Sequence, residues 1–324
     1  NLSVSGGSEQ TRFFVSGQWK ADEGIVRRTG YDKRSIRTNL NHRFSDRLSL
    51  QVGANYVNAA TRRGLTGNDN SGTTFGVALT ATPNFIDIRP DENGNYPDHP
   101  FNTSNPLHTR DIMKNEETNN RFISSGQLRY GLVVRENQSL ELVAEGGVDY
   151  YTLEQEALFP RLLQFERQSP TPGTSILGET TSLNVNWRAL AVHSYEWADR
   201  NIAFNTQAGV AAVDIDQNSA NVVADNLITG QQNINQAGQL TPNQRRVVQR
   251  DRSLFAQEEV NWNDRVITTL GLRGDRSSIN GDIDRFYLYP KASVALNTAE
   301  FEYWGVDPAS QLKLRGAFGQ TGNI

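Results

Sequence analysis

The sequence of 324 residues contains no cysteine and only four histidines. The absence of cysteine excludes a disulfide scaffold and any thiolate chemistry. No segment approaches 18 consecutive apolar residues, so the sequence holds no transmembrane helix. The formal net charge of −4 is too small to indicate a nucleic-acid partner or a charged membrane surface.

Helical periodicity of any length is also missing, whereas alternation of apolar and polar residues recurs along the whole chain. Residues 48–58 show it most clearly, because every second side chain from Leu48 to Tyr56 is apolar. This pattern predicts about twelve β-strands. They are expected at Leu2–Gly6, Thr11–Lys20, Ser35–Asn41, Leu48–Asn58, Arg121–Tyr130, Leu140–Tyr150, Leu183–Ala191, Ile202–Ala212, Ser253–Trp262, Val266–Arg276, Phe286–Leu296 and Leu312–Gly319.

The connections between these strands alternate strictly between short and long. Short turns are predicted at Gly7–Gln10, Phe44–Arg47, Arg135–Gln138, Trp197–Asn201 and Asn263–Asp264. Long loops are predicted at Glu23–Tyr31, Arg63–Asn120, Glu154–Ser182, Gln217–Arg252 and Ser277–Arg285. A soluble β-sandwich has no reason to sort its loops by length, whereas an outer-membrane barrel has tight periplasmic turns at one rim and long external loops at the other. We therefore expect all short turns at one rim.

The two faces of the strands also fit a membrane barrel. A spanning β-strand needs only about 9–11 residues with alternate ones apolar, so the lack of an apolar helix does not exclude a membrane. The apolar face suits lipid, as expected for Leu50, Val52, Ala54 and Tyr56, and the polar face suits a water-filled lumen. An array of extracellular β-sandwiches, or a solenoid, is the alternative. The candidate lumen-facing residues are Arg37, Asn39, Gln51, Asn55, Arg273, Asp275, Lys313 and Arg315.

Three stretches resemble SusC/RagA-like TonB-linked outer-membrane proteins. Residues 1–26 are similar to a barrel hairpin of that family, and residues 268–278 contain its Arg-x-Asp-x-Ser-Ser run. Residues 312–323 resemble its Leu-Lys-Leu-Arg-x-x-x-Gly-x-Thr-Gly-Asn signature. The matching residues of the first two stretches are Asn1, Ser3, Ser5, Gly6, Gly7, Phe13, Glu23, Gly24, Ile25, Arg273, Asp275, Ser277 and Ser278. The three motifs occur in the family's order across nearly the whole chain.

The resemblance implies an all-β fold, namely an antiparallel transmembrane β-barrel of which this chain supplies about twelve of a probable 22 strands. In the family, more strands follow the Thr-Gly-Asn motif, and an open edge in lipid leaves backbone groups unsatisfied. We therefore expect residues 1–324 to be an internal part of the barrel domain, with the plug domain, the TonB box and the closing strands outside this sequence. The last strand should pair with Phe286–Leu296 and direct Leu314 and Phe318 toward lipid.

The resemblance also implies a function, the import of a large nutrient across the outer membrane of a Gram-negative, Bacteroidetes-like bacterium. The expected substrate is a glycan, an oligosaccharide or a peptide. The expected partners are a SusD-like surface lipoprotein, TonB acting through the missing N-terminal part, and outer-membrane lipid; neither a cofactor nor nucleic acid is expected. Two alternatives stay open, a TonB-dependent receptor for iron chelates or cobalamin, and an outer-membrane barrel enzyme or adhesin.

Patterns that carry catalysis or metal binding are scarce. The histidines are scattered at His42, His99, His108 and His193, and none has the spacing of a metal site. The first and last lie near strand ends, where an interfacial or lumen-facing position is expected. His99 and His108 are then the only candidates for an enzyme site at the external rim. The stretch DENGNYPD, residues 91–98, lacks the spacing of a calcium loop and predicts a tight turn.

The longest predicted loop, Arg63–Asn120, carries four aromatic residues among Asn, Asp and Gly. These are Phe75, Phe85, Tyr96 and Phe101. One interpretation is that they only pack the loop against its neighbours. The other is that some of them contact a solute or a lid protein, and the sequence leaves both open.

Overall fold

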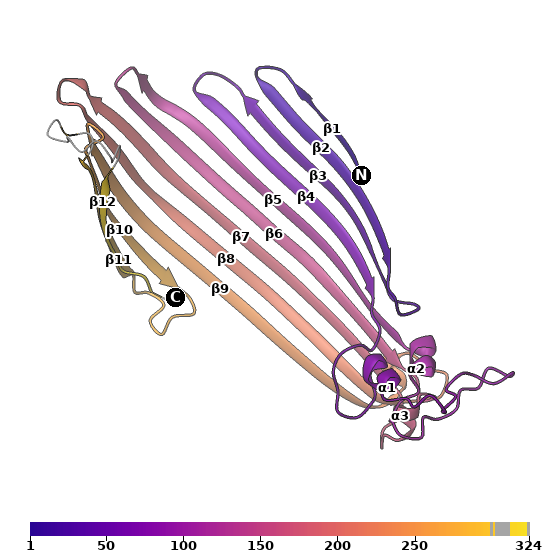
Figure 1. Ribbon diagram of the computed structural model, residues 1–324. Helices are drawn as coiled ribbons and strands as arrows, with labels where there is room; N and C mark the ends of the chain where they lie inside the picture. Colours follow the sequence, from indigo (N-terminus) through magenta and orange to yellow (C-terminus); the bar gives the residue numbers. More distant parts are fainter. Residues whose placement is uncertain (299–300, 302–311, 323–324) are drawn as a thin grey trace.

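The computed structural model describes residues 1–298, 301 and 312–322. These residues form one 12-stranded antiparallel sheet in which each strand pairs with its neighbours in the sequence, and β1 and β12 are the two edges (Figure 1). The strands are β1 (Leu2–Gly7), β2 (Thr11–Glu23), β3 (Gly30–Arg43), β4 (Leu48–Arg62), β5 (Lys114–Arg135), β6 (Gln138–Phe159), β7 (Thr174–Trp197), β8 (Ile202–Leu227), β9 (Ala237–Trp262), β10 (Val266–Ser277), β11 (Tyr287–Asn297) and β12 (Lys313–Gly319).

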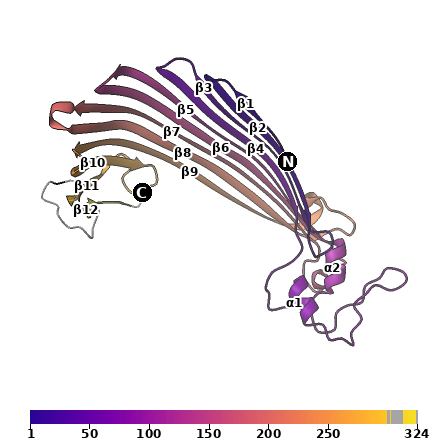
Figure 2. The ribbon, with the colours of Figure 1, turned by 45° about the horizontal axis from the view of Figure 1, so that its top comes forward.

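The prediction of twelve strands is confirmed, but two predicted loops are wrong in extent. Most of Glu154–Ser182 belongs to β6 and β7, and most of Gln217–Arg252 belongs to β8 and β9. Both faces of these strand extensions carry polar residues, so the alternation that marks a half-buried strand disappears there. The sheet curves along its whole width (Figure 2).

Short helices occur in the long connections, which corrects the expectation that helices are absent. They are α1 (Phe75–Thr80), α2 (Pro106–Ile112) and α3 (Gln164–Arg167), with single 3-10 turns η1 (Ala198–Arg200) and η2 (Ile234–Gln236). Elements of six or seven residues are too short to show a period of 3.6. No helix in the described part of the chain is long and apolar enough to cross a membrane.

Short turns and long connections lie at opposite ends of the sheet, as predicted. Figure 1 shows the turns at the upper end and all three α-helices at the lower end. Left-handed residues close two of the turns, namely Asn201 (φ 52°), Asn263 (φ 50°) and Asp264 (φ 56°). Asn and Asp tolerate this conformation better than other residues with a side chain, which explains their place there. The connection from β11 to β12 lies mostly outside the described residues.

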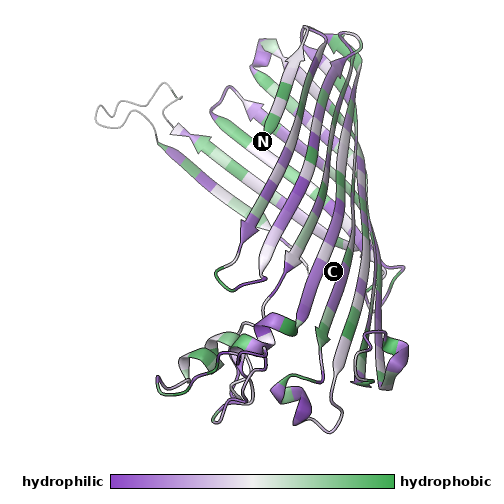
Figure 3. Cartoon of the chain, turned by 90° about the vertical axis from the view of Figure 1, so that its right-hand side faces the viewer, coloured by the Kyte–Doolittle hydropathy of each residue, from purple (hydrophilic) through white to green (hydrophobic). Residues whose placement is uncertain are grey.

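The middle of each strand alternates between green apolar and purple polar residues (Figure 3). Large apolar side chains on one face of the sheet are exposed. Trp19 is 71% exposed, Leu142 43%, Leu270 58% and Phe318 64%. A water-soluble sheet would cover such a row, whereas lipid covers it in a membrane. The few fully buried residues instead lie in or beside the long connections, for example Leu163, Asn105 and Leu227.

The terminal strand confirms the predicted pairing on one side. β12 pairs with β11 in antiparallel register, from Lys291 opposite Gly319 to Asn297 opposite Lys313. The other side of β12 is an edge of the sheet within the described residues. Leu314 and Phe318 are 54% and 64% exposed, as expected for a lipid-facing row.

Candidate functional site

The polar face of the sheet holds a hollow of about 1010 Å³ between β3 and β8. Three of the predicted lumen-facing residues, Arg37, Asn39 and Gln51, line it. Asn55 lies directly opposite Arg37 across β3 and β4, which puts it on the same face. A Cβ atom on Gly53 would meet Asn39 Oδ1 at 3.3 Å, so Gly53 shares this face as well. That the hollow faces the lumen of a closed barrel stays a prediction.

Hydrogen bonds join the polar side chains of this hollow into a ladder. Gln127 Nε2 and Arg188 Nε both donate to the carboxylate of Glu145. Four residues further along β6, Asp149 also lines the hollow, and its Oδ1 accepts a hydrogen bond from Arg121 Nε at 2.8 Å. The groups come from neighbouring strands and point to the same side, because residues opposite each other in the register share a face. The arrangement offers many donors and acceptors to a polar solute and no activated nucleophile.

A second hollow of about 510 Å³ lies on the same face near the C-terminal end of the chain. The predicted residues Arg273 and Asp275 both line it, and Arg273 Nε lies 2.8 Å from both carboxylate oxygens of Asp275. Lys291 lines it too. Strand alternation and the register place Lys313 and Arg315 of β12 on the face of Lys291, where both are exposed.

The four predicted loop aromatics have different environments. Tyr96 stacks on His108, with ring centroids 4.8 Å apart, and its hydroxyl donates to Asp111. Phe75 begins α1 and lines a basic pocket at the loop end. Phe85 and Phe101 are 75% and 66% exposed. Tyr96 therefore packs the loop, whereas Phe85 and Phe101 are open to a solute or a partner, and their role as contacts stays a prediction.

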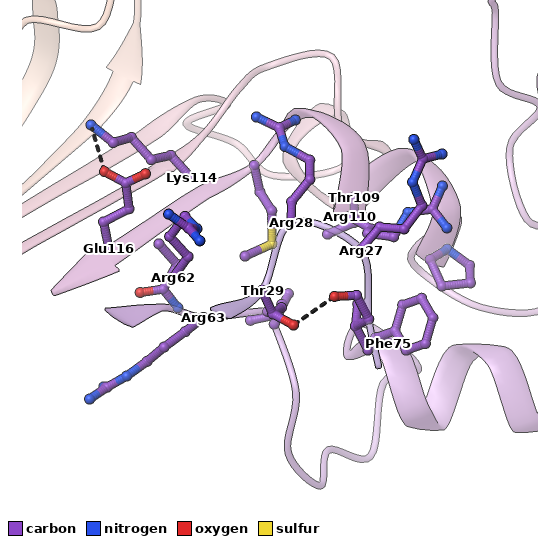
Figure 4. A pocket seen from close by; sticks show the side chains of 16 residues that line it. Arg27, Arg28, Thr29, Arg62, Arg63, Phe75, Thr109, Arg110, Lys114 and Glu116 are labelled. Atoms are coloured by element: carbon purple, nitrogen blue, oxygen red, sulfur yellow. Dashed lines mark hydrogen bonds and ion pairs between the residues drawn. The ribbon is translucent and has the colours of Figure 1, made fainter. Parts of the chain in front are cut away.

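A basic pocket of about 300 Å³ opens where the β2–β3 connection, the C-terminal end of β4 and α2 meet (Figure 4). Two Arg-Arg pairs, Arg27-Arg28 and Arg62-Arg63, come from segments far apart in the sequence. Arg110 of α2 and Lys114 at the start of β5 complete a set of six cations, with Glu116 as the single acid in the lining. This pocket was not predicted from the sequence, in which the two Arg-Arg pairs are its local signal.

Acidic residues behind the pocket hold several of its cations. Arg63 lies 2.7 Å from Glu117, and Arg62 lies 3.4 Å from Asp32. Arg110 Nε donates to Asp111 at 2.8 Å, and this bond lowers the pKa of the Asp111 carboxyl. Lys114 pairs with Glu116 and Glu156, at 3.4 and 2.6 Å. Within the described residues Arg27 and Arg28 have no carboxylate at ion-pair distance, so the opening keeps an excess of positive charge. Such a surface suits a carboxylate, sulfate or phosphate group.

The histidines do not form an enzyme site. His99 is 2% exposed and its Nδ1 accepts hydrogen bonds from the backbone N–H groups of Phe101 and Asn102, at 3.1 and 3.0 Å. Burial lowers the pKa of His99 and of His108, which is stacked on Tyr96. Among the described residues, no three His, Asp or Glu side chains are arranged to hold a metal ion. In residues 91–95 the Asp91 carboxylate instead accepts from Asn93 and Asn95, which forms the predicted turn.

A curved antiparallel sheet with an apolar outer belt, polar hollows and long connections at one end defines the wall of an outer-membrane transport barrel. The comparisons agree with this class. The family model described as TonB dependent receptor-like, beta-barrel, matches residues 61–323. The chain belongs to this family, whose members are transporters of the outer membrane and not enzymes.

Individual relatives are distant in sequence. TonB-dependent receptor P26 of Formosa agariphila is 23% identical over 346 aligned positions, which cover 100% of this chain and 32% of the relative. The structure of the RagAB peptide transporter is 17% identical, with a TM-score of 0.76 over 99% of this chain and 36% of that chain. The ferric citrate transporter FecA is 10% identical, with a TM-score of 0.54 over 92% of this chain and 39% of that chain.

These findings confirm the resemblance to SusC/RagA-like barrels and the predicted all-β barrel fold. The chain spans about a third of the length of the relatives that it matches.

Proposed function

We propose that this chain forms part of the wall of a TonB-dependent importer for a large nutrient, a glycan, an oligosaccharide or a peptide. One observation carries the proposal: the fold follows that of the RagAB peptide transporter over 99% of the chain at a TM-score of 0.76. The likeness to FecA is lower, at 0.54, which supports the large-nutrient importer over a receptor for iron chelates.

The polar hollows support the same function. A transport path needs hydrogen-bonding groups that bind a polar solute weakly at several points rather than one tight site. The ladder around Glu145 and the hollow at Arg273 provide such groups on one face of the sheet. Residues 1–324 are proposed to be an internal part of the barrel domain, with the plug domain, the TonB box and further strands contributed by other segments of the protein.

A SusD-like lipoprotein is the proposed partner at the outer end, and TonB is the proposed partner on the periplasmic side. Phe85 and Phe101 are exposed in the longest connection, where large apolar side chains favour a protein interface. Both side chains lie beyond the strands, so the membrane does not cover them. They are the proposed contacts to the lipoprotein or to a solute.

The basic pocket is the proposed first contact for acidic groups of the solute. Peptides and acidic glycans both carry carboxylates, so the pocket is compatible with either substrate class. It does not by itself choose between them, and neutral glycans would have to be held by the polar hollows instead.

Growth of the native bacterium tests the proposal. Deleting the gene should abolish growth on one large glycan or on peptides as the sole source of carbon, and spare growth on the monomeric sugars or amino acids. Inactivating TonB should give the same defect. A deletion strain that loses only the uptake of an iron chelate or cobalamin would overturn the large-nutrient proposal.

A further inference from the structure

Two arginines lie directly opposite each other on the apolar face of the sheet. Arg252 of β9 pairs with Arg276 of β10 in the antiparallel register. Both share their face with apolar neighbours two or four residues away, Leu254 and Leu272, which are 53% and 48% exposed. Like charges directly opposite each other destabilise a strand pair, so this position needs a compensating negative charge.

The strand geometry gives the depth of this pair. Ten residues separate Arg252 from Trp262 at the turn end of β9, and ten separate Arg276 from Val266 at the start of β10. At about 3.3 Å per residue and a tilt of about 40°, ten residues rise about 25 Å, the height of the apolar band of an outer-membrane barrel. The arginines therefore lie at the outer boundary of the hydrocarbon, where lipid headgroups begin.

Carboxylates of the protein satisfy only part of this positive charge. Arg252 Nη1 donates to Asp214 Oδ1 at 2.6 Å, and Arg250 Nε lies 3.7 Å from the same atom. Asp216 lies 4.0 Å from Arg250 and 3.3 Å from Arg246. Three outward-facing arginines thus share two aspartates, and Arg276 adds a fourth positive charge on the same face.

Arg276 has no carboxylate within ion-pair distance in the part of the chain that the structure describes. Its guanidinium lies over the ring of Phe286, 5.3 Å from the centroid. This contact holds the side chain on the outer face and leaves its N–H donors unused by any acid. Asp251 and Asp275 are adjacent in sequence to the pair but point to the opposite face.

We propose that Arg250, Arg252 and Arg276 bind the phosphate groups of lipid A in the outer leaflet of the membrane. Guanidinium groups bind phosphate through paired N–H donors, and a phosphate between Arg252 and Arg276 removes the repulsion of that pair. Leu254 and Leu272, directly below, contact the acyl chains of the same lipid. The site faces away from the lumen, so it takes a lipid and not the transported solute.

Lipid binding to the full-length transporter tests the proposal. The protein is reconstituted in phosphatidylcholine nanodiscs and titrated with lipid A or with lipid A from which both phosphates have been removed, and bound lipid is counted by native mass spectrometry. We expect a preference of roughly tenfold or more for the phosphorylated lipid. Equal binding of the two lipids by the unmodified protein would overturn the proposal, and this comparison needs no variant.

Variants then locate the site. The double variant Arg252→Gln/Arg276→Gln should lose the preference, and Asp214→Asn should increase it by removing a competing acid. Arg245→Gln is the matched control, because Arg245 lies on the same strand but faces the other side. A preference that survives in the double variant, or that disappears equally in the control, would contradict the assignment.

Discussion

Gln164 hydrogen-bonds both backbone groups of His99: its Oε1 accepts from the N–H at 2.8 Å, and its Nε2 donates to the carbonyl oxygen at 2.9 Å. Nε2 also donates to the carbonyl oxygen of Asn102 at 3.0 Å. Gln164 belongs to α3 in the β6–β7 connection, and His99 lies in the β4–β5 connection. One buried amide side chain therefore joins two external connections, which explains how the longest of them keeps a defined shape.

Replacing this amide should loosen the longest connection without affecting the sheet. Gln164→Leu leaves two buried backbone groups of His99 and one partly buried carbonyl of Asn102 without their partner, at a cost of about 1–3 kcal/mol for each buried group. We expect faster hydrogen exchange in residues 98–104 and unchanged exchange in β5 and β6. Gln168→Leu is the control, since Gln168 is exposed at the other end of the same short helix. Equal effects of the two variants would contradict the role given to Gln164.

The same connection should become less stable in acid because of His99. Its Nδ1 accepts two backbone N–H groups and must be unprotonated, and burial lowers its pKa from 6.5. A lowered pKa contributes stability above the unfolded value, and this is lost as pH falls below about 6.5. Burial raises the pKa of Glu166, which acts with the opposite sign. The protection factors for amide exchange in residues 98–104 should fall between about pH 7 and pH 5. His99→Asn, which cannot titrate, should remove most of that fall, and His108, whose pKa burial also lowers, accounts for the remainder.

Cysteine labelling tests which face of β4 meets water. The 324 residues contain no cysteine, so a single introduced thiol within them can be followed. Gln51→Cys and Asn55→Cys should react with a water-soluble maleimide in intact outer membranes, whereas Val52→Cys and Tyr56→Cys should be shielded by lipid. Neighbouring positions serve as controls for each other. The opposite pattern would mean that the assignment of lumen and lipid faces is wrong, because a shift of one residue exchanges the two faces.

Gly209 should not accept a side chain. A Cβ atom there would lie 2.5 Å from the carbonyl oxygen of Ala189 and 2.8 Å from Cζ of Phe255. Gly209→Val should therefore destabilise the barrel by about 1–3 kcal/mol, the usual cost of overpacking, measured by thermal unfolding in detergent. Gly17→Val is the control, because a Cβ atom at Gly17 has no neighbour within 4 Å. A similar small loss in both variants would contradict the prediction.

Removing one charge from the basic pocket should weaken the binding of acidic solutes. Arg27 is exposed in this pocket, so Arg27→Gln should leave the fold intact and reduce the affinity for a carboxylate-bearing oligosaccharide or peptide several-fold. The difference should shrink at high salt, since exposed charges are screened. Arg89→Gln serves as the control, because Arg89 pairs with Asp87 outside the pocket. Isothermal titration with the full-length protein gives the affinities.

The membrane-crossing part of the fold could be predicted from the sequence, because lipid on one side and water on the other force a period of two on each strand. The extensions of β8 and β9 could not, since water on both sides removes that constraint. α2 had a local signal, Asn105 followed by Pro106, in which Asn105 Oδ1 accepts from the N–H groups of Leu107 and His108. The helix has only seven residues, too few to show helical periodicity, and was therefore not predicted.

The candidate sites depend on contacts that no local pattern contains. Arg27 and Arg110 line one pocket only because the strand register brings the β2–β3 and β4–β5 connections together. The pairing of Arg252 with Arg276 likewise follows from the register of β9 and β10. The residues that share one face of a strand could be predicted from the sequence. The residues that lie opposite them on a neighbouring strand could not, because they depend on the register.

The length of β8 and β9 has a consequence for how a solute is captured. Each strand has 26 residues, whereas crossing the bilayer takes about 9–11. The remaining 15 or so residues, at about 3.3 Å each and a tilt of about 40°, extend the wall about 40 Å beyond the hydrocarbon. The external connections therefore follow directly from the ends of paired strands and not from flexible segments. Capture at that height requires little ordering of the backbone, so less of the binding free energy is lost to conformational entropy.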